Sequence, residues 1–152
     1  MQTGQSATEQ HEAYMRICIN LATAARHRGD SPVGSIVVLD GRVIGEGIEG
    51  GKTHKDITHH AEIEAIRQAN VFLGGQDLSG CTLYTTHEPC IMCSYIIRHA
   101  RIATVVMGVY SGAIGGYSSR YPLLSDTTIT TWGPPPMLVA GVLQQECTAL
   151  YS

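Results

Sequence analysis

Positive charge is scarce in this chain. Among its 152 residues, ten are Lys or Arg and thirteen are Asp or Glu, and none of residues 121–152 is Lys or Arg. Proteins that bind a nucleic-acid backbone neutralise its phosphates with clusters of basic side chains, and the sequence contains no such cluster. The composition therefore argues against a nucleic-acid partner.

Long apolar runs are also missing. No stretch approaches the roughly 20 apolar residues that a membrane helix needs, and Met1–Gln10 is too polar to form the core of a secretory signal. We therefore expect no membrane partner and a cytoplasmic location. Hydrophobic residues still make up 43% of the chain and charged residues 15%, a composition typical of a packed protein. The length predicts a single domain over residues 1–152.

The chain has five cysteines, an odd number that argues against a disulfide framework. Cys18, Cys81 and Cys147 lie in apolar periodic segments, which indicates small buried side chains. Cys90 and Cys93 form a Cys-x-x-Cys pair and need a different explanation.

Hydrophobic periodicity and turn residues predict an α/β fold, in which helices cover a mixed sheet that begins with a hairpin. The predicted helices are Glu9–Arg28, His60–Asn70, Cys90–Ala100 and Gln144–Tyr151. The predicted strands are Val33–Leu39, Arg42–Ile48, Cys81–Thr86, Ile102–Met107 and Met137–Val139. Glu49–Ile57 and Gly108–Asp126 are predicted loops, and the β-branched run Thr127–Thr131 is stopped by the prolines that follow it.

Two short motifs carry chemistry: His60-Ala61-Glu62, and Cys90 with Cys93 preceded by proline. One imidazole and two thiolates match a zinc site that keeps its fourth position open for water. Residues three apart on a helix share a face, so the two thiols can bind one ion. His60 and Cys90 both fall at predicted helix starts, where the helix dipole favours thiolate. The pattern predicts one Zn²⁺ per chain.

Glu62 has a different predicted role. Two residues along a helix correspond to about 200° of rotation, so Glu62 should point away from the direction of His60. A carboxylate beside the metal, rather than bound to it, can take a proton from water and pass it to a leaving group. We expect Glu62 to be the catalytic acid–base group.

A structural zinc site is the alternative of another class. It would need a fourth ligand, and His54, His59 and His87 are all near in sequence. The protein would then be a non-catalytic, zinc-stabilised binding module. The number of protein ligands, four or three, separates the two hypotheses.

The two motifs together resemble the signature of the zinc deaminases. Pro32–Gly47, His60–Ala69, Thr82–Cys93 and Gly141–Leu150 are similar to the branch that contains bacterial tRNA adenosine deaminase, yeast-type cytosine deaminase and bacterial guanine deaminase. The resemblance implies a three-layer α/β/α sandwich around a mixed five-stranded sheet, and a homodimer. It also implies zinc ligands at the His and Cys positions of the two motifs and a proton shuttle at the Glu.

The same resemblance implies substrate contacts at Glu49, Ala61, His87 and Glu88, with the Glu88 carbonyl accepting from the leaving amine. Glu49 stands where this branch usually has Asn. An ionised carboxylate only accepts hydrogen bonds, so Glu49 favours a ring that offers N–H groups, unless it is a solvated loop residue.

We therefore expect a hydrolase that acts on C–N bonds in cyclic amidines and has a small-molecule substrate. It would remove an exocyclic amino group, as ammonia, from a free nucleobase or a related guanine-, cytosine-, pterin- or triazine-like ring. The alternative within the same family is a tRNA adenosine deaminase.

Overall fold

A mixed five-stranded sheet lies at the centre of the computed structural model, which describes residues 6–152. Residues 1–5 of the predicted domain lie outside the described part. The strand order is β2-β1-β3-β4-β5. β1 runs antiparallel to β2 and β3, whereas β3, β4 and β5 are parallel. The strands are β1 Gly34–Leu39, β2 Arg42–Ile48, β3 Thr82–His87, β4 Thr104–Val109 and β5 Met137–Val139.

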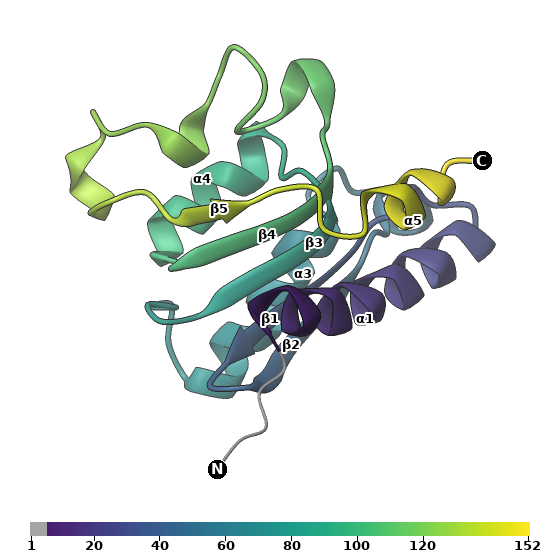
Figure 1. Ribbon diagram of the computed structural model, residues 1–152, viewed down its shortest axis with the longest axis horizontal. Coiled ribbons are helices and arrows are strands. Elements are labelled where there is room, and N and C mark those ends of the chain that lie inside the picture. The colour runs from purple at the N-terminus through teal and green to yellow at the C-terminus, as the bar shows by residue number, and fades with distance from the viewer. Residues whose placement is uncertain (1–5) are drawn as a thin grey trace.

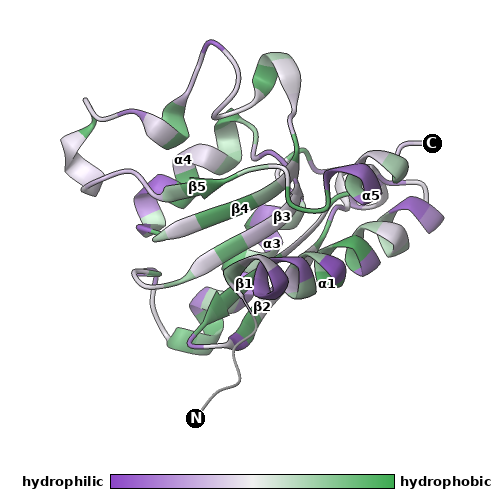
Figure 2. Ribbon diagram, viewed as in Figure 1, coloured by the Kyte–Doolittle hydropathy of each residue, from purple (hydrophilic) through white to green (hydrophobic). Residues whose placement is uncertain are grey.

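Helices cover both faces of this sheet. α1 (Ala7–His27) and α5 (Gln144–Ala149) lie in front of the sheet in Figure 1, and α3 (Ala61–Leu73) and α4 (Ile91–Ala100) lie behind it. Figure 2 shows hydrophobic residues along β4, while hydrophobic and hydrophilic residues alternate along α1, as expected for a helix with one buried face. The predicted three-layer α/β/α sandwich is confirmed.

Each face of the sheet has its own hydrophobic core. The core under α1 and α5 includes Met15, Cys18, Ile36, Val106 and Cys147. The core under α3 and α4 is larger, and its fully buried members include Val37, Ala65, Leu83, Ile97, Val105 and Met107. Alternate residues of β1 and β4 enter opposite cores, as the two-residue period of a strand requires.

Local sequence explains the first elements. Ser6 Oγ accepts from the Glu9 N–H at 3.1 Å, and Glu9 Oε1 accepts from the Ser6 N–H at 3.2 Å, so this capping box starts α1 two residues before the predicted Glu9. Asp40 (φ 50°) and Gly41 (φ 75°) form the tight turn between β1 and β2 that the sequence predicted.

Two segments form turns of helix that the sequence did not predict. Residues 49–57 are not all loop, because Gly51–His54 forms a short helix, α2. For the β-branched run Thr127–Thr131 the sequence predicted only that the following prolines stop it, and it forms no strand. Thr130–Trp132 is instead a single 3₁₀ turn, and the guanidinium of the buried Arg98 lies close to the backbone carbonyls of Ile129 and Gly133 on either side of it.

The sequence argues against a disulfide framework and contains no apolar run of membrane length. All five cysteines lie within residues 6–152, and all five are free. In the same range, no helix combines the length and the hydropathy that crossing a membrane requires. The predicted cytoplasmic location stays a prediction.

Close packing of α3 on β2 gives a test of the fold. A Cβ on Gly45 would lie 2.2 Å from the Ala65 carbonyl oxygen and 2.9 Å from the Ala69 nitrogen, and a helix backbone cannot yield locally. We expect Gly45→Ala to lower the free energy of unfolding by about 1–3 kcal/mol, measured by denaturant titration. Gly75→Ala is the matched control, because nothing lies within 4 Å of its Cβ position. Equal stability of the two variants would contradict this packing.

Candidate active site

Three potential metal ligands meet where α3 and α4 begin. His60 is the N-cap residue of α3 and Cys90 is the N-cap residue of α4, with Cys93 in the first turn of α4. His60 Nδ1 lies 3.6 Å from Cys90 Sγ and 3.4 Å from Cys93 Sγ. Among the described residues, these three are the one group of His, Cys, Asp and Glu side chains whose ligand atoms all lie within 4.8 Å of one another.

The three side chains polarise one another. The hydrogen bond from the Cys93 thiol, aided by His60, lowers the pKa of Cys90 to about 4 although the thiol is partly buried. Its hydrogen bond to Cys90 raises the pKa of His60 to about 9. The site therefore favours a thiolate at Cys90, and a thiolate is the form that binds metal.

This donor set fits zinc. Two thiols and one imidazole are preferred zinc ligands, and three protein ligands leave a fourth position for water. The histidines that could have closed a structural site are not part of this group: His54 and His59 stack on each other at 4.0 Å, and His87 lines the same cavity but bonds to Tyr151. The chemistry of the group matches an open zinc site better than a closed one.

Glu62 lies in the first turn of α3 and is 4% exposed. Burial raises the pKa of Glu62 to about 7, so the group exchanges protons near neutral pH. A divalent cation at the neighbouring ligands would favour its anionic form. Glu62 lines the same cavity as His60 and Cys90, as the proposed proton shuttle must.

A cavity of about 230 Å³ opens over these groups. Its walls come from six separate segments of the chain: the turn after α1, the end of β2, the start of α3, the end of β3 with the start of α4, the loop after β4 and the chain after α5. The lining residues are Ser31, Val33, Glu49, His60, Glu62, His87, Glu88, Cys90, Ser111, Ile114 and Tyr151.

Three of the four predicted substrate contacts line the cavity: Glu49, His87 and Glu88. Ala61 is fully buried and its side chain is not part of the wall. The reason is the approach of β2, because a Cβ on Gly47 would lie 1.8 Å from the Ala61 carbonyl oxygen.

Glu88 holds the loop that follows β4. Its buried carboxylate accepts from the N–H groups of Ser111 (2.9 Å), Tyr117 (2.8 Å) and Ser118 (2.7 Å), and from Ser118 Oγ (2.6 Å). Burial alone would raise the pKa of Glu88, but these hydrogen bonds lower it below its ordinary value. The Glu88 carbonyl accepts from Ser111 Oγ, so this loop is attached to the residues that precede Cys90 at both the side chain and the backbone.

Tyr151 was not identified from the sequence. Its hydroxyl lies 2.9 Å from His87 Nδ1, and the two rings meet edge to face at the cavity. Burial lowers the pKa of His87, which keeps the ring neutral near pH 7. Tyr151 lies 64 residues from its partner, so no local pattern could have indicated the contact.

A family model for the cytidine and deoxycytidylate deaminase zinc-binding region matches residues 8–109. The chain belongs to this family of zinc-dependent deaminases, which are hydrolases acting on carbon–nitrogen bonds. The cofactor is therefore zinc, and the three clustered ligands are its candidate site.

Individual relatives extend over most of the chain. It is 35% identical over 138 residues to the tRNA-specific adenosine deaminase of Aquifex aeolicus, covering 89% of this chain and 91% of that protein. A structure from studies of A-to-I editing by tRNA:A34 deaminases at the wobble position superposes with a TM-score of 0.84 and 33% identity, covering 91% of this chain and 98% of the other. The guanine deaminase of Bacillus subtilis superposes less completely, with a TM-score of 0.64 and 39% identity over 66% of this chain and 64% of its own.

These relatives contradict two expectations from the sequence, a free nucleobase as substrate and the absence of a nucleic-acid partner. Residue totals do not show that exposed basic residues of α1 and of the turn after it bond beside the cavity. Arg26 donates to the carbonyl of Ser152, next to the cavity residue Tyr151, and Arg28 donates to the carbonyl of Glu49. The homodimer stays a prediction.

The ligand set can be tested by metal analysis. We expect one zinc per chain in the purified protein and a loss of most of it in Cys90→Ser and in His60→Ala, because each variant removes one of three ligands. Elemental analysis of the dialysed protein measures this. Cys81→Ala is the matched control, because Cys81 is a buried thiol outside the ligand group. Full zinc content in Cys90→Ser would show that the ion is held elsewhere.

Proposed function

We propose that this protein hydrolytically deaminates adenosine in tRNA, at the wobble position of an anticodon, to give inosine. The observation that carries the proposal is the similarity over nearly the whole length of a tRNA:A34 deaminase structure. The similarity to the Aquifex aeolicus tRNA-specific adenosine deaminase over 89% of this chain supports it.

The proposal gives each group at the cavity a role. His60, Cys90 and Cys93 would hold the zinc, which when bound would make a water molecule nucleophilic at neutral pH. Glu62 accepts a proton from that water and gives a proton to N1 of adenine as oxygen adds to C6. Glu62 then takes the proton of the new C6 hydroxyl and passes it to the amino group, the C6–N6 bond breaks as the C6 carbonyl forms, and ammonia leaves.

Glu88 holds the leaving group through its backbone. A carbonyl oxygen has two lone pairs, so it can accept from the amino N–H while it also accepts from Ser111 Oγ. The Glu88 side chain is fully used in holding the loop after β4, and it takes no part in proton transfer in this proposal.

Glu49 fits a nucleotide as well as it fits a free ring. A nucleotide carries hydrogen-bond donors on its sugar, which a free ring lacks. An adenosine offers its N6 amino group and its ribose 2′-hydroxyl, and either can donate to a carboxylate. A bond to the 2′-hydroxyl would also distinguish RNA from DNA.

Basic side chains flank the cavity on the side of α2. Lys52 and Lys55 are exposed and follow Glu49 within six residues. The exposed Arg28 bonds to the cavity residue Glu49, and the exposed Arg26 bonds to Ser152, the neighbour of the cavity residue Tyr151. The acidic Asp30 between them is buried and paired with Arg28, so it does not offset this charge at the surface. These cations support contact with RNA phosphates beside the target base.

Inosine formation tests the proposal. The zinc-loaded protein is incubated with tRNA transcripts that carry adenosine or guanosine at position 34, and inosine is read by reverse transcription and by nucleoside analysis. We expect inosine only at A34 in the wild type. In Glu62→Gln we expect zinc content and fold to be kept and turnover to fall by a factor on the order of 10²–10⁴.

Two results would contradict the proposed function. If the zinc-loaded wild type leaves every A34 transcript unmodified, tRNA adenosine is not the substrate. If Glu62→Gln deaminates A34 at the wild-type rate, Glu62 is not the proton shuttle, whatever the substrate.

The two lysines test the RNA surface. We expect Lys52→Ala with Lys55→Ala to weaken tRNA binding and to reduce the slope of log K against log salt concentration by roughly one unit per lysine, because each phosphate contact releases counterions. Filter binding at several salt concentrations measures the slope. Arg42→Ala is the control, since Arg42 starts β2 at the far end from Glu49 and packs on Phe72. An unchanged slope in the lysine variant would place the RNA on another surface.

A further inference from the structure

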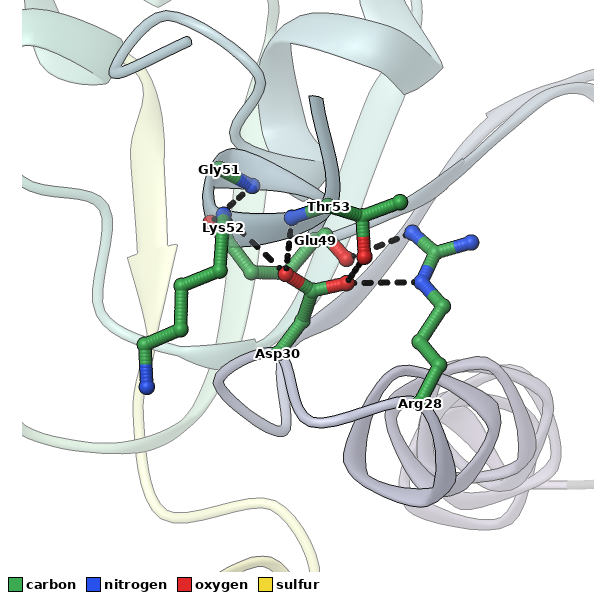
Figure 3. A network of polar contacts seen from close by, with 6 residues as sticks. All are labelled: Arg28, Asp30, Glu49, Gly51, Lys52 and Thr53. Carbon is green, nitrogen blue, oxygen red and sulfur yellow. Dashed lines mark hydrogen bonds and ion pairs between the residues drawn. The ribbon is translucent and has the colours of Figure 1, made fainter. Parts of the chain in front are cut away.

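Two carboxylates share the amino end of α2 (Figure 3). Glu49 Oε2 accepts from the Gly51 N–H at 3.1 Å. Asp30 Oδ1 accepts from the next two N–H groups, those of Lys52 at 3.1 Å and Thr53 at 3.0 Å. Glu49 lines the cavity, whereas the Asp30 side chain is fully buried between the end of α1 and α2.

Asp30 is the more firmly held of the two. Its Oδ2 accepts from Thr53 Oγ1 at 2.5 Å and from Arg28 Nε at 2.7 Å. Burial alone would raise the pKa of Asp30, but the hydrogen bonds from Thr53 and Arg28 outweigh it and lower the pKa to about 2. Asp30 is therefore ionised at every pH at which the protein would act, and both of its oxygens are fully bonded.

The network continues from Asp30 to the backbone of Glu49. Arg28, which bonds Asp30 through Nε, donates through Nη2 to the Glu49 carbonyl at 2.8 Å. The Glu49 N–H donates to the Val33 carbonyl at 3.1 Å. The Glu49 backbone is thus fixed on both sides.

The side chain of Glu49 is constrained by the same network. Because Asp30 occupies the N–H groups of Lys52 and Thr53, the Gly51 N–H is the donor of this helix end that stays available to Glu49. We propose that Asp30 is a positioning residue that acts through Glu49. It excludes the Glu49 carboxylate from the rest of the α2 amino end and so keeps it at the cavity wall. The inference rests on the proposed function in one respect, that Glu49 contacts the substrate.

Replacing Asp30 by Asn would disturb both parts of this arrangement. The amide nitrogen of Asn cannot accept from Arg28 or from Thr53 Oγ1, so one of the two oxygens loses its bonds. Arg28 then loses its anchor beside the Glu49 carbonyl. In the other orientation of the amide, its nitrogen faces the N–H groups of Lys52 and Thr53 instead, and these freed donors of α2 attract the Glu49 carboxylate away from the cavity.

A double-mutant cycle on tRNA deamination tests the proposal. The four proteins are the wild type, Asp30→Asn, Glu49→Gln and the double variant, each with its zinc content and thermal stability recorded. We expect Asp30→Asn alone to lower kcat/KM by about tenfold, mainly through KM, and to lower it less than twofold in the Glu49→Gln background. Asp77→Asn is the matched control, because Asp77 accepts from Ser79 N and Ser79 Oγ in the same way at an exposed turn.

A merely structural Asp30 gives a different result. Its replacement would then lower activity by the same factor in both backgrounds, which would overturn the proposal, as would wild-type kinetics in Asp30→Asn. Wild-type kinetics in Glu49→Gln would overturn it too, because Asp30 would have no contact to act through.

A second variant and a second readout keep the proposal testable if Asp30→Asn fails to fold or if tRNA is not modified. Arg28→Lys keeps the charge next to Asp30 but cannot bond Asp30 and the Glu49 carbonyl at the same time. As for Asp30→Asn, we expect it to lower kcat/KM more in the wild-type background than in the Glu49→Gln background. Amide hydrogen exchange at Gly51, measured without substrate, should be faster in Asp30→Asn or Arg28→Lys than in Asp77→Asn. Unmodified tRNA with faster exchange at Gly51 would refute the proposed function alone, whereas unchanged exchange would refute the positioning by Asp30.

Discussion

The contact between the His60 imidazole and the two thiols of α4 governs the arrangement of everything else at the site. It joins the first turns of two helices that are separated by β3, and each helix must therefore begin at the same edge of the sheet. α3 reaches that position because β2 carries glycines where the helix backbone approaches, so that Gly45 and Gly47 lie closer to α3 than any side chain would allow. The packing of α3 on β2 therefore fixes the position of the metal-binding His60, since a shift of α3 would move His60 and Glu62 together.

The sequence alone was sufficient for the parts of the site that depend on local geometry. Cys90 and Cys93 come together because they are three residues apart, and His60 and Glu62, two residues apart, both line the cavity. The cavity wall is different, because Tyr151 and Ser31 come from segments far from the motifs and meet there only through tertiary packing. α2 was missed for a similar reason: a four-residue helix has too few positions to show a period, and its amino end is satisfied by Asp30 from another part of the chain.

Net charge was a poor guide to the partner. The chain carries a formal charge of −3, yet its acidic groups are not distributed like its basic ones. Asp30 and Glu88 are buried, and their carboxylates accept hydrogen bonds from within the protein. Lys52, Lys55 and Arg26 are exposed. The potential that an approaching polyanion meets depends on the exposed charges near the cavity, and the total for the chain does not report it.

The Glu88 carboxylate fastens one wall of the cavity at a single point, through Ser111, Tyr117 and Ser118. Between these attachments, Gly112–Ile114 forms one 3₁₀ turn, and the Ile114 side chain reaches the cavity while staying 61% exposed. Substitutions at Ile114 would therefore alter the cavity wall while the attachments on either side of the turn, together with the β-bridge of Gly115 to Cys90, hold the rest of the loop beside the metal ligands. A scaffold with such a separation can change what it binds while it keeps the reaction that it performs.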